Sequence, residues 1–251
     1  MAGLSVIRAD TLYAMNTQDS ATAFQFDQAG EPVLDAVEIT TGPAPTASII
    51  WLHGLGADGH DFEPIVPHLA WPGAPAIRYV FPHAPVRPVT INGGMAMRAW
   101  YDIVNASLGR DHDQQGITTS MGQAAALVDR EIERGIAAGH IVVAGFSQGG
   151  AIAVQVALRY PQKLAGLVAL STYLVLDNRL DGERSPANQG IPVFAGHGTM
   201  DPVVPCHLGE QAAQRLRSLG HPVEFHDYPM PHSVCPEEIT DLAAWLRNCL
   251  A

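Results

Sequence analysis

A serine stands between two glycines in the pentapeptide Gly145-Phe-Ser147-Gln-Gly149. The pentapeptide follows the apolar run HIVVAG and precedes a helix-forming stretch, so the chain is expected to pass from a strand through a tight turn into a helix. On such a turn the serine takes a strained backbone conformation, and flanking side chains must be absent for the turn to close. The dipole at the helix N-terminus also favours a developing negative charge. We therefore predict that Ser147 is a nucleophile.

The same five letters can arise by chance, because the chain contains 24 glycines. The alternative interpretation is a glycine-rich turn with an incidental serine. The position of the motif, after an apolar run and before a helical pattern, favours the nucleophile.

A serine nucleophile needs a base in contact with it and a third group that orients the base. Two candidates for these roles occur later in the chain. Asp201 follows the apolar run 191–196, and His232 lies between another apolar run and the last helical pattern. The carboxyl ends of parallel strands share one edge of a sheet, so we expect these side chains to meet there. We predict that His232 is the general base and Asp201 the orienting acid. The rival acids are Asp177, Asp181 and Asp227.

The segment Gly54-Leu-Gly-Ala-Asp-Gly59 matches the dinucleotide-binding pattern G-x-G-x-x-G. However, no Asp or Glu occurs between Glu63 and Asp102, where a ribose would need one. We favour a different interpretation, in which this loop supplies half of an oxyanion hole. The backbone N–H groups of Leu55 and Gln148 would then point at the developing charge. No cofactor is expected.

Strand-like and helical patterns alternate along most of the chain. Apolar runs of strand length span 33–39, 48–53, 77–81, 140–145, 164–170, 191–196 and 222–228. Helical spacing marks 118–138, where a Thr-Thr-Ser start is expected, and also 148–159, 207–219 and 236–249. This alternation predicts an α/β fold with a mostly parallel central sheet and helices on both faces.

The N-terminal residues 1–30 are polar and aperiodic, and they are expected to form a poorly structured arm before a single domain, 31–251. Within that domain, residues 82–116 interrupt the alternation with several prolines and glycines. A long irregular stretch inside a compact domain is often a functional loop or lid, and we expect one here.

Composition excludes several classes of function. The chain has 25 acidic and 14 basic residues, a formal net charge of −11, whereas nucleic-acid binding requires clustered Lys and Arg. Its three cysteines lack C-x-x-C spacing, which favours a reducing cytoplasm over a disulfide framework or zinc site. No signal peptide and no run of about 18 apolar residues is found, so no transmembrane segment is expected. We expect a cytoplasmic protein without a metal.

Six blocks in the same order resemble the phospholipase/carboxylesterase family of α/β-hydrolases, which includes acyl-protein thioesterases. They are Leu52-His-Gly-Leu-Gly-Ala-Asp-Gly-His-Asp-Phe62, Met97-Arg-Ala-Trp-Tyr-Asp102, Gly145-Phe-Ser-Gln-Gly149, Leu170-Ser-Thr-Tyr-Leu174, Gly198-Thr-Met-Asp-Pro-Val-Val-Pro205 and Pro231-His-Ser233. The resemblance runs from about residue 45 to the C-terminus. It implies the α/β-hydrolase fold, the same catalytic residues and oxyanion donors, and a loop around Ile91–Trp100 that borders an acyl site.

Together these observations predict a serine hydrolase that cleaves small carboxylic esters, or acyl thioesters, through an acyl-enzyme intermediate. Met95, Met97 and Trp100 are candidates for an apolar acyl pocket, with core packing as the alternative. A catalytically silent receptor of the same fold is a second hypothesis. A lactone or dienelactone hydrolase is a third, which the serine in place of a cysteine disfavours. The choice between a monomer and a homodimer stays open.

Overall fold

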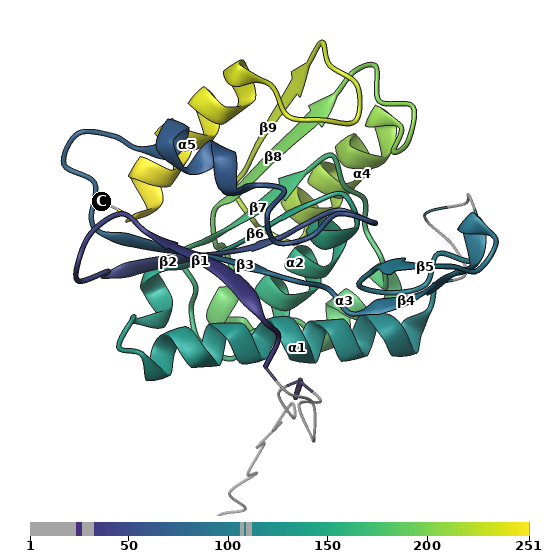
Figure 1. Ribbon diagram of the computed structural model, residues 1–251, viewed down its shortest axis with the longest axis horizontal. Helices are drawn as coiled ribbons and strands as arrows, with labels where there is room; N and C mark the ends of the chain where they lie inside the picture. The colour runs from purple at the N-terminus through teal and green to yellow at the C-terminus, as the bar shows by residue number, and fades with distance from the viewer. Residues whose placement is uncertain (1–23, 27–32, 106–107, 109–111, 251) are drawn as a thin grey trace, which may run out of the picture.

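A seven-stranded sheet forms the centre of the molecule (Figure 1). The computed structural model describes residues 24–26, 33–105, 108 and 112–250. The strand order is β1-β3-β2-β6-β7-β8-β9. Only β1 runs antiparallel, against β3, and the other five pairings are parallel. The strands are β1 (Ala36–Thr40), β2 (Ala47–Leu52), β3 (Ile77–Pro82), β6 (Ile141–Phe146), β7 (Gly166–Leu170), β8 (Val193–Gly198) and β9 (Val223–Tyr228).

Helices cover both faces of the sheet because its central strands are apolar on both sides. One face carries α1 (Gln114–Glu133), α2 (Gln148–Arg159), α3 (Asp177–Glu183) and α4 (Cys206–Ser218) (Figure 1). The other face carries α5 (Pro236–Leu250) and the 3-10 helix η1 (Glu63–Leu69). Along β2, Ile50 and Leu52 face the first layer, whereas Ile49 and Trp51 face the second. The predicted α/β-hydrolase fold is confirmed.

The helix α1 does not have the predicted bounds of 118–138. It begins four residues earlier because the Asp113 carboxylate caps it, accepting a hydrogen bond of 2.8 Å from the Gly116 N–H. It ends at Glu133 because Gly135 turns the chain with a left-handed φ of 95°. The Ile136 N–H then bonds the Glu131 carbonyl at 3.0 Å, which closes the end of the helix. The local signals were a carboxylate and a glycine, and the Thr-Thr-Ser run lies inside the helix.

The stretch 82–116, predicted to be irregular, contains a small two-stranded sheet. Its antiparallel strands β4 (Val86–Val89) and β5 (Met95–Arg98) flank the 3-10 turn η2 (Thr90–Asn92). Gly93 and Gly94 turn the chain between them with left-handed φ values of 68° and 78°. Two further 3-10 turns, η3 (Ala138–His140) and η4 (Pro186–Asn188), lie elsewhere in the fold. Strands of four residues are too short to show a clear alternation in the sequence.

Most of the predicted N-terminal arm, 1–30, lies outside the described residues, so the division at residue 30 stays a prediction. Residues 24–26 are described, and they contact the end of α2. The Phe26 ring lies 6.2 Å from the Tyr160 ring, and the Arg159 guanidinium lies 5.2 Å from the centre of the Phe24 ring. This part of the chain therefore packs on the helical layer.

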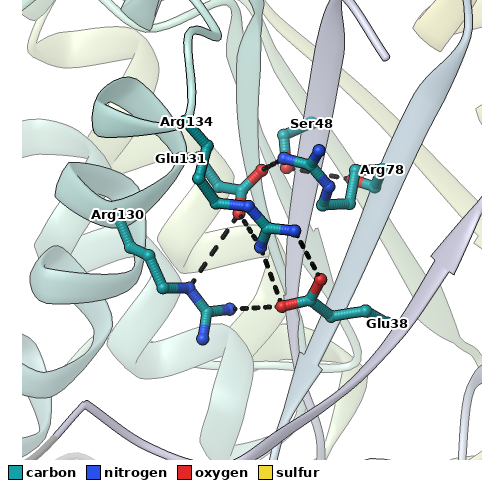
Figure 2. A network of polar contacts seen from close by, with 6 residues as sticks. All are labelled: Glu38, Ser48, Arg78, Arg130, Glu131 and Arg134. Carbon is teal, nitrogen blue, oxygen red and sulfur yellow. Dashed lines mark hydrogen bonds and ion pairs between the residues drawn. The ribbon is translucent and has the colours of Figure 1, made fainter. Parts of the chain in front are cut away.

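A network of charged side chains joins α1 to the strands β1 and β3 (Figure 2). Glu131, on α1, has a fully buried side chain and pairs with Arg78 at 2.8 Å and Arg134 at 3.0 Å. Glu38, on the edge strand β1, pairs with Arg130 at 3.0 Å and with Arg134 at 2.9 Å. These contacts hold the edge of the sheet against the helix that covers it.

Every helix in the described ranges is too short or too polar to cross a lipid bilayer.

Candidate active site

Ser147 lies at the sharp turn between β6 and α2, as the strand-turn-helix pattern predicts. Its φ of 54° and ψ of −120° are strained for a residue with a side chain, at a cost of order 1–3 kcal/mol. The surrounding chain holds it there. The Ser147 N–H donates to the Leu170 carbonyl at 2.9 Å, and the Ser147 carbonyl accepts from the Thr172 hydroxyl at 2.6 Å. These tertiary contacts therefore maintain the strained backbone conformation of Ser147.

The glycines on either side of Ser147 are required by close packing of backbone. A Cβ on Gly145 would come within 2.4 Å of the Gly149 carbonyl oxygen. A Cβ on Gly149 would come within 2.3 Å of the Leu52 carbonyl oxygen, which belongs to the neighbouring strand β2. No side chain fits at either distance, which explains why the turn needs glycine at both positions.

His232 connects Ser147 to Asp201. Its Nδ1 atom lies 2.6 Å from Asp201 Oδ2, and its Nε2 atom lies 2.9 Å from Ser147 Oγ. A carboxylate only accepts hydrogen bonds, so Nδ1 carries the proton and Nε2 is left to accept the serine hydroxyl proton. The Phe146 ring packs against the imidazole, with ring centres 4.7 Å apart. Three side chains from distant parts of the sequence thus form one chain of hydrogen bonds.

The Asp201 carboxylate is fixed by its own loop, which follows β8. Its Oδ1 atom accepts the backbone N–H groups of Val203 and Val204, both at 2.8 Å. Another histidine, the buried His197, lies 3.6 Å from Asp201 Oδ2. Its Nε2 atom is 2.9 Å from the Val204 carbonyl oxygen, to which it donates. Burial lowers the pKa of His197, so this ring is a neutral support for the loop.

The rival acids do not reach the imidazole. Asp177 and Asp181 lie on α3, where both bind Arg215, at 2.6 Å and 2.8 Å respectively. Asp227 is an exposed residue of β9. Of the four aspartates considered, only Asp201 contacts His232 in the described structure.

Leu55 and Gln148 border the same cavity as Ser147. Gln148 is the first residue of α2, so its N–H is one of the four that have no acceptor inside the helix. Its side chain has a separate task that the sequence did not reveal. The Gln148 amide accepts from the Trp100 N–H at 2.9 Å and donates to the Tyr101 carbonyl at 2.8 Å. This ties the segment after β5 to the turn that carries the serine.

The loop with Leu55 is held in place by His53. The His53 Nδ1–H donates to the Gly54 carbonyl at 2.7 Å, and His53 Nε2 accepts the Ala84 N–H at 3.1 Å. Burial lowers the pKa of His53 to about 4, so the ring is neutral near pH 7. The Trp100 indole N–H donates to the His53 carbonyl at 2.9 Å. His53 therefore shapes the loop and takes no part in proton transfer.

A cavity of about 520 Å³ opens beside Ser147 and His232. Its walls are mostly apolar, and they come from the turn of the hairpin, the segment after it, and the loops beside Ser147 and Asp201. The apolar side chains are those of Leu55, Ala57, Ile91, Ile103, Leu108, Phe146, Val203 and Val204. The polar or charged ones include Asp61, Asn92 and Tyr173. Walls of this composition favour apolar ligand groups.

The predicted pocket residues do not line this cavity. Trp100 is fully buried, where its indole is bonded to His53, and Met95 is 64% exposed. Met97 accepts a hydrogen bond from the Asn92 amide at its sulfur, at 3.3 Å. Their part of the chain does border the cavity, through Ile91 and Asn92. Side-chain type alone cannot say which side of a short hairpin, or of the segment after it, faces a neighbouring loop.

No group of three or more His, Cys, Asp or Glu side chains that could hold a metal ion occurs among the described residues.

Comparisons with known proteins agree with this architecture. The sequence profile of the phospholipase/carboxylesterase family matches residues 35–250. Acyl-protein thioesterase 1 of Cryptococcus neoformans is 40% identical over 234 residues, which cover 86% of this chain and 98% of that protein. The crystal structure of Arabidopsis thaliana SOBER1 is 30% identical, with a TM-score of 0.77 over 82% of this chain and 99% of the other. That of Zea mays acyl-protein thioesterase 2 is also 30% identical, with a TM-score of 0.73 over 86% and 100%.

The family profile spans the sheet and its helices, and a curated relative is 40% identical. This chain therefore belongs to the phospholipase/carboxylesterase family of α/β-hydrolases and is a hydrolase of the ester and thioester type.

Proposed function

We propose that the chain hydrolyses carboxylic esters and acyl thioesters through an acyl-enzyme formed on Ser147, with His232 as general base and Asp201 as the orienting acid. The observation that carries this proposal is the position of His232, whose two ring nitrogens contact Ser147 Oγ at 2.9 Å and Asp201 Oδ2 at 2.6 Å. This is the geometry that proton transfer from a serine hydroxyl requires.

The first half of the reaction transfers the acyl group to the enzyme. His232 Nε2 takes the hydroxyl proton as Ser147 Oγ forms a bond to the acyl carbonyl carbon. The bond from that carbon to the leaving oxygen or sulfur then breaks, and the leaving group departs with the proton that His232 holds. The Asp201 carboxylate stabilises the imidazolium, and two backbone N–H groups and the imidazole itself hold that carboxylate in place.

The second half releases the acid. A water molecule gives a proton to His232 and attacks the acyl carbon, and the proton returns to Ser147 as the ester bond breaks. In both halves the carbonyl oxygen gains negative charge. The backbone N–H groups of Leu55 and Gln148 are the proposed donors to it, supported by the place of both residues at the cavity and of Gln148 at the start of α2. The apolar wall would hold the acyl chain.

The substitution Ser147→Ala tests this proposal. Removing a nucleophile of this kind costs about 10⁴-fold or more in kcat, with the fold intact. The measurement is hydrolysis of p-nitrophenyl esters and acyl thioesters of graded chain length, together with covalent labelling by a fluorophosphonate. Ser218→Ala, which alters an exposed serine on α4, is the matched control and should hydrolyse and label normally. Turnover near the wild-type rate in the Ser147 variant would refute the mechanism.

A further inference from the structure

Charge is unevenly distributed over the lining of the cavity beside Ser147. Among the lining residues in the described part of the chain, Asp61 is the only acidic one. It lies on the turn between β2 and η1, where its backbone N–H bonds the Asp58 carbonyl at 3.2 Å. Its side chain is exposed at the edge of a wall that is otherwise mostly apolar. A negative charge at such an edge acts on any ligand charge that lies within a few ångströms.

Two neighbouring carboxylates on this turn have different surroundings. Asp58 accepts the His60 N–H at 2.8 Å, and this bond, with the nearby His60, His83 and Arg98, lowers the pKa of Asp58. Among the described residues no hydrogen bond or ion pair reaches the Asp61 carboxylate, and partial desolvation at the cavity edge together with the charge of Asp58 raises its pKa. Asp58 is thus a structural carboxylate that is already satisfied. Asp61 is left to attract a cation from outside the protein.

The apolar lining of the cavity limits where a substrate can carry a charge. A charged acyl chain would lose its hydration against the side chains of Ile91, Ile103 and Leu108, and burying an unpaired charge is costly. The acyl part must therefore be apolar. A cationic substrate can carry its charge only on the alcohol or thiol part, which leaves the site after Ser147 is acylated.

We propose that Asp61 is a specificity residue that selects esters and thioesters whose leaving group carries a positive charge. This inference rests on the function proposed above, in which Ser147 is acylated and the alcohol or thiol departs. The net charge of −11 adds a diffuse field of the same sign over the whole surface. The contribution of Asp61 is local, so it must be separated from that field by comparison with a second carboxylate.

A pair of thioesters of equal shape makes the test. S-Butyrylthiocholine has a quaternary nitrogen where S-(3,3-dimethylbutyl) thiobutyrate has a carbon, and both release a thiol that a disulfide reagent measures. The quantity of interest is the kcat/KM for the cationic thioester divided by the kcat/KM for the neutral thioester. At low ionic strength Asp61→Asn should lower this ratio by about three- to tenfold. Raising the salt concentration should move the wild-type ratio towards that of the variant.

Asp58→Asn is the matched control, because it removes one negative charge from the same turn outside the cavity lining. It should change the ratio by less than about twofold. An unchanged ratio in Asp61→Asn would overturn the inference, and so would an equal fall in both variants, which would point to the diffuse field. The proposed function fails on a different result, namely turnover of both thioesters by Ser147→Ala.

Discussion

Asp201 and Glu131 are both acidic residues with fully buried side chains, yet their surroundings are opposite. Three arginines surround Glu131, with Arg78 at 2.8 Å, Arg134 at 3.0 Å and Arg130 at 4.0 Å (Figure 2). Asp201 contacts two backbone N–H groups and the imidazole of His232. Permanent cations neutralise Glu131 in every state of the protein. Among the described residues no Lys or Arg pairs with Asp201, and in the proposed mechanism its cation is the imidazolium that His232 forms.

Glu238 adds a third case, because its buried carboxyl has no hydrogen-bond partner among the described residues. It lies in the first turn of α5 and packs so tightly on β8 that a Cβ on Gly196 would come within 2.0 Å of it. Burial raises the pKa of Glu238 to about 8. One carboxyl is thus paired with cations, one is held by neutral donors, and one stays protonated. The partners, and not the burial, decide what each carboxyl does.

The largest expected effect comes from Asp201→Asn. An amide at this position no longer holds the proton of His232 on Nδ1, and such a change lowers kcat by about 10⁴-fold in a comparable triad. The measurement is kcat for a p-nitrophenyl ester, with urea unfolding to show that the protein is still folded. Asp177→Asn, which alters the rival acid bound to Arg215, should retain normal turnover. Comparable losses of kcat in both variants would contradict a special role for Asp201.

Glu238→Gln tests the unpaired carboxyl through the pH dependence of stability. Glu238 stays protonated in the folded protein up to about pH 8, whereas its ordinary pKa is 4.5. The folded state therefore binds the extra proton between these values, and wild-type stability falls as pH rises through the window. Glutamine does not titrate, so the variant should gain in unfolding free energy relative to wild type, by at most about 5 kcal/mol at pH 8. Urea unfolding at pH 5 and pH 8 measures this difference, and a difference that does not change with pH would exclude the protonated carboxyl.

Glu131→Gln tests the carboxylate that the arginines neutralise. Removing one partner of a buried ion pair leaves the others unpaired and costs about 3 kcal/mol of unfolding free energy. Turnover of the folded protein should not change, because the network joins α1 to β1 and β3 and does not contact Ser147. Equilibrium unfolding and kcat, measured on the same preparation, check both parts. A variant with normal stability and lowered kcat would reverse the assignment.

The smallest effect is expected for Glu38→Gln in the same network. Glu38 and its partners Arg130 and Arg134 are 26–35% exposed, so water can replace the lost contacts. Partly exposed pairs of this kind contribute about 0.2–1 kcal/mol. Unfolding at low and high salt measures the difference. A loss as large as that for Glu131→Gln would show that the network acts as one unit and does not divide by burial.

Much of this architecture can be predicted from the sequence because patterns within a few residues determine it. The bounds of α2 agree with the predicted 148–159, and each of the seven predicted apolar runs overlaps one strand of the sheet. Features that no local pattern fixes could not be placed from the sequence. The start of α1 depended on a single Asp113 carboxylate, and the pocket residues depended on how a hairpin of four-residue strands turned against the loop at Leu55.

The amino-acid sequence by itself determined the order of strands and helices, the glycines around Ser147 and the appearance of Asp201 and His232 after later strands, because periodicity and backbone sterics act over a few residues. Only the tertiary structure decided the distances. The contact of His232 with Ser147 joins residues 85 positions apart, and the lining of the cavity combines side chains from several loops. Such contacts depend on how separate elements pack together, which no local pattern records.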